Sequence, residues 1–346
     1  MNEATQDRVS KVLDSQSPVQ QRRAIAKAIT LLESTRADHR QQGDDLLTAL
    51  LPYTGKALRL GISGVPGVGK STFIEALGTY LTAQGHKVAV LAIDPSSTVS
   101  GGSILGDKTR MEQLSVNPKA YIRPSPSSGT LGGVAEKTRE SMLVCEAAGY
   151  DVVIVETVGV GQSEIAVHGM TDMYCVLQLP NAGDDLQAIK KGVMERADLV
   201  VINKADIDPN AATRAQAQIT SSLRLQGMHG NPDHANTGAL WQPRVLQLSA
   251  LKGEGVDKFW AAVQQFQQLQ TANGRLAARR EKQSLEWMWE RIDAGLKLAF
   301  KQHPQVQALL PRMQVEVACG KLAASTAARN LLAAQSQQAH TASKFE

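Results

Sequence analysis

Residues 58–72 constrain this chain more than any other stretch. Within them, Gly64-x-x-x-x-Gly69-Lys70-Ser71 fits the phosphate-loop pattern without a mismatch. The apolar residues 58–62 predict a buried strand before the loop, and residues 72–84 predict a helix after it. Glycines permit the tight turn that points backbone N–H groups at a phosphate, and the helix adds the positive end of its dipole. We therefore expect the chain to bind a nucleoside triphosphate.

The expected phosphate site has two residues with specific roles. Lys70 would reach the β- and γ-phosphates as a catalytic charge, and the Ser71 hydroxyl would bind Mg²⁺. The residues expected to hold the phosphates are Gly64, Val65, Pro66, Gly67, Val68, Gly69, Lys70, Ser71 and Thr72.

Six apolar runs alternate with helical patterns from residue 58 onward. The runs are Leu58–Ile62, Val88–Ile93, Val152–Val155, Tyr174–Leu179, Leu199–Ile202 and Val245–Leu248. Continuous apolar strands of this kind are typical of a parallel sheet covered by helices on both faces. We therefore predict an α/β fold with a mostly parallel sheet, in which ligands bind at the carboxyl ends of the strands.

Acidic residues follow two of these predicted strands. Asp94 and Asp107 come after the second strand, and Glu156 closes the third, with Gly159 three residues later. An Asx turn or a helix cap would also explain each aspartate. Beside a phosphate loop, however, carboxylates suit Mg²⁺, which binds one or two of them together with waters and phosphate oxygens. We expect Ser71, Asp94, Asp107 and Glu156 to hold the metal, and the Gly159 N–H to sense the γ-phosphate.

The residues after the fifth and sixth strands indicate guanine. Asn203-Lys204-Ala205-Asp206 places a carboxylate that accepts from both N1–H and the exocyclic amine of guanine, donors that adenine does not offer. The Lys204 stem would cover the base. Ser249, Ala250 and Leu251 would present a backbone N–H to guanine O6. GTP and GDP are therefore the expected nucleotides.

Two further segments carry no definite chemistry. Residues 123–129 with Gly132-Gly133 are expected to form a flexible loop, because they are rich in Pro, Ser and Gly. Residues 183–192, which contain Lys190, follow the fourth strand, and their chemistry fits a functional loop and a capped surface helix equally well.

The ends of the chain are helical in pattern. We predict an N-terminal helical extension over residues 1–51, ending in a short helix over Asp44–Leu51, a nucleotide-binding domain over residues 52–272, and a C-terminal helical arm over residues 273–346. In the arm, the pattern of Arg275–Lys301 predicts one long helix.

Composition excludes several classes of protein. The net charge of +4 over 346 residues is too small to indicate a nucleic-acid or membrane partner. Three scattered cysteines suggest neither a disulfide framework nor a cysteine zinc site. The polar N-terminus and the lack of a membrane-spanning apolar run predict a cytoplasmic protein.

The motifs together resemble the ArgK/MeaB-type GTPases, which serve adenosylcobalamin-dependent methylmalonyl-CoA mutase. The resemblance covers residues 45–300, and its most specific part is Gly101-Gly-Ser-Ile-Leu-Gly-Asp-Lys-Thr-Arg110. Thr98 stands where the family usually has proline, and Asn181 where it usually has glycine. Both departures fall in loops.

The resemblance implies more than the residues do. It implies a homodimer held by the C-terminal arm, and a GTP-dependent chaperone that binds the mutase and gates cobalamin delivery and protection. It also implies that residues 183–192 form a third switch, in which Lys190 moves toward the nucleotide and acts in catalysis. No cobalamin site is legible in this chain.

Two other functions fit part of the pattern. A kinase acting on a small molecule or a transport-related protein would use the same phosphate loop, but no acceptor pocket is legible and Asn203-Lys-Ala-Asp206 selects guanine. A nickel metallochaperone GTPase would carry Cys/His clusters near its switches, whereas this chain offers only His168 there.

Overall fold

The computed structural model describes residues 3–34, 36–93, 111–124, 131–157, 163–181, 191–228 and 240–342. The chain divides into two compact units, Met1–Arg280 and Glu281–Glu346, which are described separately. The predicted boundaries at residues 51/52 and 272/273 stay a prediction. None of the helices in the described ranges is both long and apolar enough to cross a membrane.

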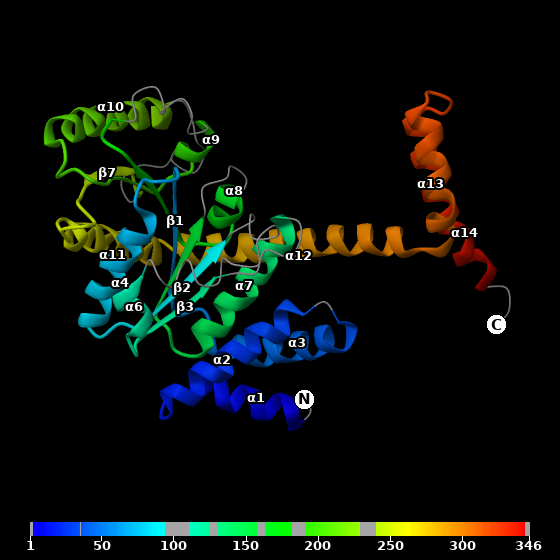
Figure 1. Ribbon diagram of the computed structural model, residues 1–346, viewed down its shortest axis with the longest axis horizontal. Coiled ribbons are helices and arrows are strands. Elements are labelled where there is room, and N and C mark those ends of the chain that lie inside the picture. Colours follow the sequence, from blue (N-terminus) through cyan, green and yellow to red (C-terminus); the bar gives the residue numbers. More distant parts are fainter. Residues whose placement is uncertain are drawn as a thin grey trace. The chain divides into compact units, whose positions relative to one another are not determined.

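The first unit is built on a central sheet (Figure 1). The sheet has seven strands in the order β3-β2-β4-β1-β5-β6-β7. Every strand pair in it is parallel. The strands are β1 (Leu58–Gly64), β2 (Val88–Ile93), β3 (Ala120–Pro124), β4 (Val152–Thr157), β5 (Met173–Gln178), β6 (Leu199–Ile202) and β7 (Arg244–Gln247). This arrangement confirms the predicted fold class.

Strand β1 lies at the point where the strand order reverses. It pairs with β4 on one side, with Ile62 opposite Glu156, and with β5 on the other, with Gly64 opposite Leu177. At such a switch point the loops that follow neighbouring strands diverge and leave a crevice for a ligand. The loop after β1 is the phosphate loop, so the sequence motif and the topology both predict a ligand site at the end of β1.

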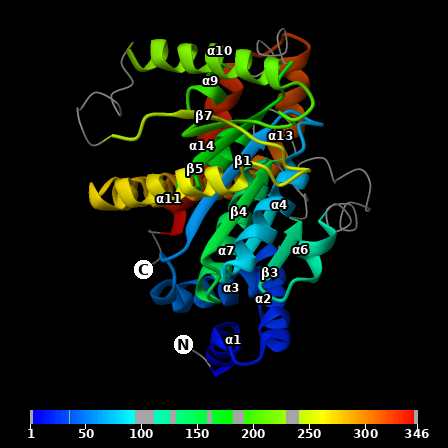
Figure 2. The same cartoon turned by 90° about the vertical axis from the view of Figure 1, so that its left-hand side faces the viewer.

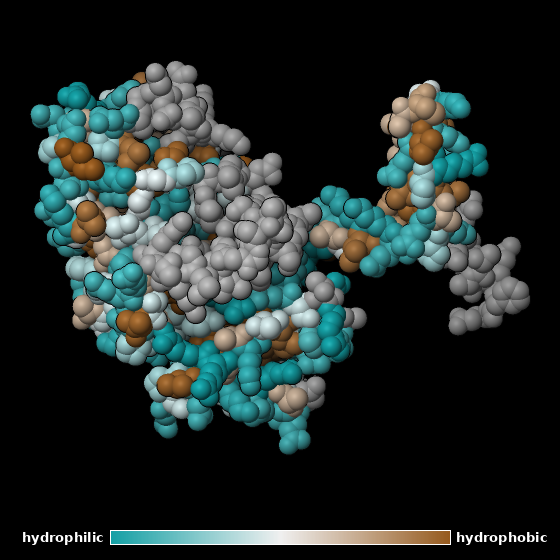
Figure 3. All heavy atoms as spheres, in the orientation of Figure 1, coloured by the Kyte–Doolittle hydropathy of each residue, from teal (hydrophilic) through white to brown (hydrophobic). Residues whose placement is uncertain are grey.

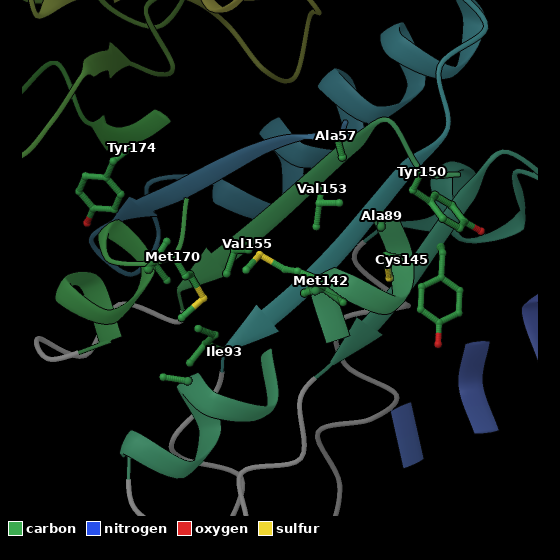
Figure 4. Close-up of a cluster of buried hydrophobic side chains, with 14 of the residues drawn as sticks. Ala57, Ala89, Ile93, Met142, Cys145, Tyr150, Val153, Val155, Met170 and Tyr174 are labelled. Carbon is green, nitrogen blue, oxygen red and sulfur yellow. The ribbon is translucent and has the colours of Figure 1, made fainter. Parts of the chain in front are cut away.

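Helices cover both faces of the sheet (Figure 2). One buried cluster joins the sheet to α4 and α11, where the rings of Phe73 and Phe259 meet edge to face at 4.9 Å. The other cluster, part of which is drawn in Figure 4, joins the opposite face to α7, α10 and the N-terminal helices. The helices of this unit are α1 (Glu3–Leu13), α2 (Pro18–Glu33), α3 (Ala37–Leu50), η1 (Leu51–Tyr53), α4 (Lys70–Ala83), α6 (Glu112–Val116), α7 (Leu131–Ala147), α8 (Ser163–His168), α9 (Lys191–Met194), α10 (Pro209–Met228), α11 (Val256–Ala272) and the start of α12 (Arg275–Gln302).

The expected loop over residues 123–133 is partly wrong. Arg123 and Pro124 belong to β3, and Gly132 and Gly133 lie in the first turn of α7. Strand β3 escaped the sequence analysis because Arg123 and Pro124 interrupt its apolar run. It is an edge strand, where proline is tolerated and a charged residue can face outward. Arg123 there forms an ion pair with Glu33 of α2.

The N-terminal extension is helical, as predicted, but its last helix is longer than expected. Helix α3 begins at Ala37 rather than Asp44, and Gly43 lies inside it. A Cβ on Gly43 would lie 3.1 Å from Leu32 Cδ2, so the glycine lets α3 approach α2 closely. In the sequence the glycine resembles a helix breaker, whereas packing between the two helices explains it.

Two arginines at the start of α12 contact residues at the end of the sheet opposite the phosphate loop. Arg280 donates to both carboxylate oxygens of Asp172, at 2.7 and 2.6 Å, and to the carbonyls of Gly55 and Ala57. The Asp172 side chain is fully buried and also accepts from the backbone N–H of Arg59 at 2.8 Å. Arg279 Nη1 donates to Asp198 Oδ2 at 3.2 Å. The first turns of α12 therefore belong to the nucleotide-binding unit.

We expect Arg280→Ala to destabilise the protein by about 3 kcal/mol, because it leaves the buried Asp172 carboxylate without its cationic partner. The measurement is urea denaturation of the full chain. Arg312→Ala is the matched control, since its ion pair with Glu316 is exposed and such pairs contribute about 0–1 kcal/mol. Equal stability of the two variants would contradict a structural role for the Arg280–Asp172 pair.

The second unit consists of helices alone in the part of it that the structure describes. It contains the rest of α12, α13 (Pro304–Ala318) and α14 (Ala324–Ala342). Helices α13 and α14 pack against each other and bury Val306, Ala327 and Leu331. The long helix predicted over Arg275–Lys301 is present as α12.

Candidate nucleotide site

The loop between β1 and α4 has the backbone that a phosphate loop requires. Gly64, Gly67 and Gly69 have φ angles of 152°, 79° and 93°, which disfavour residues with a side chain. Two of them also lack space. A Cβ on Gly64 would lie 2.6 Å from the carbonyl oxygen of Leu177, and one on Gly69 would lie 2.6 Å from Asn203 Nδ2. The loop is therefore fixed by its own glycines and by contact with the strands beside it.

Lys70 points into this loop. Its ammonium donates to the carbonyl oxygens of Gly64 at 2.7 Å and Val65 at 3.2 Å, and the residue is buried. Burial lowers the pKa of Lys70, while Glu156 and Glu164 oppose that shift. A bound anion would offset the desolvation of this cation, so the site is electrostatically prepared for a phosphate.

Ser71 and Glu156 lie side by side at the mouth of the loop. The Ser71 hydroxyl donates to Glu156 Oε1 at 3.4 Å, and Glu156 is buried at the end of β4, next to β1. A hydroxyl and a carboxylate oxygen are hard donors of the kind that Mg²⁺ prefers, so this pair fits the expected metal. Within the described ranges there is no cluster of three or more His, Cys, Asp or Glu side chains able to hold a metal. Mg²⁺ usually keeps several waters and binds through one or two carboxylates and the phosphates of its substrate.

Asn203 joins the phosphate loop to the loops that follow β6 and β7. Its Nδ2 donates to the carbonyl of Val68 at 2.8 Å, and its Oδ1 accepts from the N–H groups of Lys204 at 2.8 Å and Ala250 at 3.0 Å. One buried amide therefore sets the distance between the phosphate end of the site and the expected base end. The Val68 side chain is buried in the core, so this residue serves the site through its backbone.

Lys204 lies across the phosphate loop. It has a φ of 59°, rare for a residue with a side chain, and its ammonium donates to the carbonyl of Gly67 at 3.0 Å. This bond holds the aliphatic stem beside the loop, in agreement with a stem that covers a flat base.

Asp206 has a cationic neighbour that the sequence analysis missed. Lys252 Nζ lies 3.4 Å from Asp206 Oδ2, and the Asp206 side chain is only 14% exposed. A hydrogen bond from the Ser249 side chain, together with Lys252, holds the pKa of Asp206 below its usual range. Asp206 is therefore ionised at neutral pH. Lys252 directly follows Ser249-Ala-Leu251, the segment expected to contact guanine. This position beside a predicted binding segment was the signal in the sequence that could have indicated Lys252.

The structure brings the expected phosphate-binding and base-binding residues to one edge of the sheet. Leu251 is included in that group, but its side chain is 84% exposed and only its backbone can serve the site. Asp94, Asp107, Gly159 and Lys190, as well as Thr98, lie outside the described residues, so their roles remain predictions. Asn181 is described, and it lies exposed in a turn after β5.

Comparison with known proteins shows the family of this chain. A profile of the family described as "Methylmalonyl Co-A mutase-associated GTPase MeaB" matches residues 25–305. A protein named "Putative GTPase" from Caulobacter vibrioides is 54% identical over 313 residues, covering 90% of this chain and 94% of the relative. A mouse protein named "Methylmalonic aciduria type A homolog, mitochondrial" is 47% identical, covering 91% of this chain and 76% of the relative.

A solved structure described as "Crystal structure of LAO/AO transport system kinase" has a similar fold. It aligns with a TM-score of 0.71 and 38% identity over 96% of this chain and 97% of that chain. The profile covers most of the sequence, including the phosphate loop, Glu156 and the Asn203–Asp206 segment. The chain belongs to the family of methylmalonyl-CoA mutase-associated GTPases of the MeaB type.

Proposed function

We propose that this protein binds and hydrolyses GTP in the site formed by the loops after β1, β4, β6 and β7. The observation that carries the proposal is Asn203, which bonds to both the phosphate loop and the Ala250 N–H. It places Asp206, the expected guanine acceptor, at a fixed separation from Lys70, the expected phosphate ligand. Hydrolysis by the protein alone is slow, because only part of the positive charge that phosphoryl transfer requires is present.

The proposed metal is Mg²⁺, held by Ser71 and Glu156 with help from Asp94 and Asp107. When bound, Mg²⁺ neutralises charge on the β- and γ-phosphate oxygens. Lys70, whose ammonium contacts the loop carbonyls of Gly64 and Val65, would supply a second positive charge, and Glu156 would orient the Ser71 hydroxyl through their hydrogen bond. The Gly159 N–H is proposed to sense the γ-phosphate, so the segment after β4 would differ between the GTP and GDP states.

The proposed partner is adenosylcobalamin-dependent methylmalonyl-CoA mutase. Family membership and the name of the mouse relative support this partner. The protein would act as a chaperone that protects the mutase and gates cofactor delivery in a GTP-dependent way. The test is pull-down from the native host with GDP and with a non-hydrolysable GTP analogue. Co-purification of the mutase in amounts that depend on the nucleotide is expected, and its absence in both states would refute the partner.

Residues 183–192 are proposed as a third switch. Lys190 would be brought toward the γ-phosphate when the mutase docks, so the mutase would act as the activating protein. Positive charge supplied in this way raises hydrolysis by about 10³–10⁵-fold in enzymes that use an arginine finger. Because binding coupling is reciprocal, the GTP state would also change the affinity for the mutase.

We also propose a homodimer formed through the second unit. Within this unit, helix α12 exposes apolar side chains at helical spacing. Figure 3 shows hydrophobic residues on the exposed surface of this helix. They are Leu285, Met288, Trp289, Ile292 and Leu296. A stripe of this size on a helix requires a partner to bury it.

The double substitution Trp289→Asp and Leu296→Asp is expected to give a monomer that binds GTP as tightly as the wild type. Light scattering measures the mass in solution. Substitution is preferable to truncation at Gly274, because truncation would also remove Arg279 and Arg280 from the first unit. The matched control is Leu225→Asp, an exposed leucine on α10. A monomeric wild type, or a dimeric double variant, would contradict the proposal.

A further inference from the structure

The loop after β7 brings a lysine to the expected base end of the site. Lys252 Nζ lies 3.4 Å from Asp206 Oδ2, and the Lys252 side chain is 53% exposed. An ion pair between two mobile, exposed side chains contributes little to binding or stability. This pair differs, because the backbone holds both of its partners and the carboxylate is largely shielded from solvent.

The loop that carries Lys252 is closed on itself. Ser249 and Glu254 exchange two backbone hydrogen bonds, from Ser249 N to Glu254 O at 3.0 Å and from Glu254 N to Ser249 O at 3.1 Å. Gly253, with a φ of 70°, donates its N–H to the carbonyl of Ala250 at 3.3 Å. The Lys252 N–H donates to Ser249 Oγ at 3.3 Å. These bonds fix the backbone at Lys252 without using its side chain, so a substitution there leaves them in place.

The turn that carries Asp206 is anchored to the same part of the chain. The Ala205 N–H donates to the carbonyl of Leu248, at the end of β7, at 3.1 Å. The Ile207 N–H donates to the carbonyl of Lys204 at 3.2 Å and closes the turn around Asp206. Backbone hydrogen bonds therefore hold both partners of the ion pair in place.

The Asp206 carboxylate has two supports on this loop. One is a hydrogen bond from the Ser249 side chain, whose oxygen accepts from the Lys252 N–H and whose own proton is left for Asp206. The other is the Lys252 ammonium beside Oδ2. A carboxylate oxygen can accept more than one hydrogen bond, so these supports are compatible with the two donors of guanine.

Guanine binding would take the Asp206 charge out of water. As proposed, the base donates from N1–H and its exocyclic amine, and it displaces the water that solvates the carboxylate. Removing an ionised carboxylate from water is costly unless a cation stays beside it. Lys252 is placed to be that cation, and its attraction to Asp206 strengthens as the base excludes water, because the local dielectric constant falls.

We propose that Lys252 is a positioning residue that strengthens guanine recognition: its ammonium holds the Asp206 carboxylate in place and balances its charge while the base is bound. This inference rests on the proposed function, because it takes Asp206 as the guanine acceptor. It adds to that function a residue outside the Asn203–Asp206 and Ser249–Leu251 segments.

The test compares GDP affinity in variants of Lys252, measured by competition with a fluorescent nucleotide. Lys252→Met keeps an unbranched apolar side chain without the charge, and it should bind GDP about fivefold more weakly, the upper end for an exposed ion pair. Lys252→Arg keeps the charge and should stay within about twofold of the wild type. Lys252→Glu puts a second carboxylate beside Asp206 and should weaken GDP binding about 20-fold or more, because like charges repel.

Lys258→Glu is the matched control for charge reversal. Lys258 is an exposed lysine in the first turn of α11, so this variant undergoes the same change in net charge as Lys252→Glu. It should bind GDP within about twofold of the wild type, because exposed charges at a distance are screened by salt.

A second readout separates charge balance from damage to the loop. Asp206→Asn lacks the carboxylate, so adding Lys252→Met to it should change the affinity for xanthosine diphosphate by less than about twofold. The urea midpoints of Lys252→Met and the wild type should coincide, because the bonds that fix the loop at this residue are backbone bonds.

The outcomes separate the inference from the function on which it rests. If Lys252→Met binds GDP as tightly as the wild type or more tightly, the lysine does not support the carboxylate and the inference is overturned. Equal losses in Lys252→Glu and Lys258→Glu, or a fivefold loss when Lys252→Met is added to Asp206→Asn, would also overturn it. If the wild type does not prefer GDP to ADP, the proposed function fails before any variant is compared.

Discussion

Lys70→Ala is expected to lower the kcat for GTP hydrolysis at least about 100-fold. The Lys70 ammonium is buried and aimed into the phosphate loop, where it donates to the carbonyls of Gly64 and Val65. In phosphoryl transfer, catalysis comes mainly from fixed positive charge around the γ-phosphate, and removal of one such preorganised donor costs about 10²–10³ in kcat. Single-turnover hydrolysis with the variant in excess over GTP measures the chemical step.

Lys56→Ala is the control for this experiment. Lys56 is exposed and precedes β1. It carries the same charge as Lys70 but lies at the end of β1 that is away from the phosphate loop. The Lys56→Ala variant should hydrolyse GTP at the wild-type rate. Turnover by Lys70→Ala at the rate of Lys56→Ala would show that the loop lysine does not act on the phosphates.

Asp206→Asn is expected to weaken GTP binding by about 10²–10⁴-fold and to shift preference toward xanthine nucleotides. The carboxylate is ionised, because Ser249 and Lys252 hold its pKa below the usual range. As proposed, it accepts two hydrogen bonds from guanine, and a hydrogen bond to a charged group contributes about 1.5–3 kcal/mol. An amide accepts only through its oxygen and instead donates through its nitrogen, which suits the N1/C2 edge of xanthine.

Competition among GTP, XTP and ATP for a fluorescent nucleotide measures this change. Asp208→Asn is the matched control, because Asp208 accepts from the Ala211 N–H at the start of α10, a role that asparagine fills equally well. It should keep the wild-type preference for GTP. Equal binding of ATP and GTP by the wild type would contradict base recognition by Asp206.

The sheet could be predicted because its strands are buried on both faces. Strand β2, for example, is buried at every position and therefore appears in the sequence as a continuous apolar run. Strand β3 has no such continuous apolar run, because Tyr121 and Ile122 are followed by Arg123 and Pro124 at the edge of the sheet. The start of α3 was missed for a similar reason, because the role of Gly43 depends on its distance from Leu32 in another helix.

In the candidate site, too, local sequence patterns could be predicted and contacts between distant segments could not. The residues of the phosphate loop and of Asn203–Asp206 could be predicted as candidates because the members of each group lie within a few positions of one another in the sequence. Contacts between distant segments left no local pattern. One example is the Lys252–Asp206 ion pair. Another is the hydrogen bond from the Gln113 N–H at the start of α6 to the Glu75 carboxylate of α4, which joins residues 38 positions apart. The start of α12 belongs here too, because Arg280 meets Asp172 across 108 positions.

We propose above that this chain is a guanine-nucleotide switch that responds to a mutase. The most direct test is the rate of Mg²⁺-dependent GTP hydrolysis by the purified protein, alone and with purified adenosylcobalamin-dependent methylmalonyl-CoA mutase. We predict slow hydrolysis of GTP by the protein alone, a faster rate when the mutase is added, and no hydrolysis of ATP in either case. Hydrolysis of ATP as fast as GTP, or a GTP rate that the mutase leaves unchanged, would show that the chain is not such a switch.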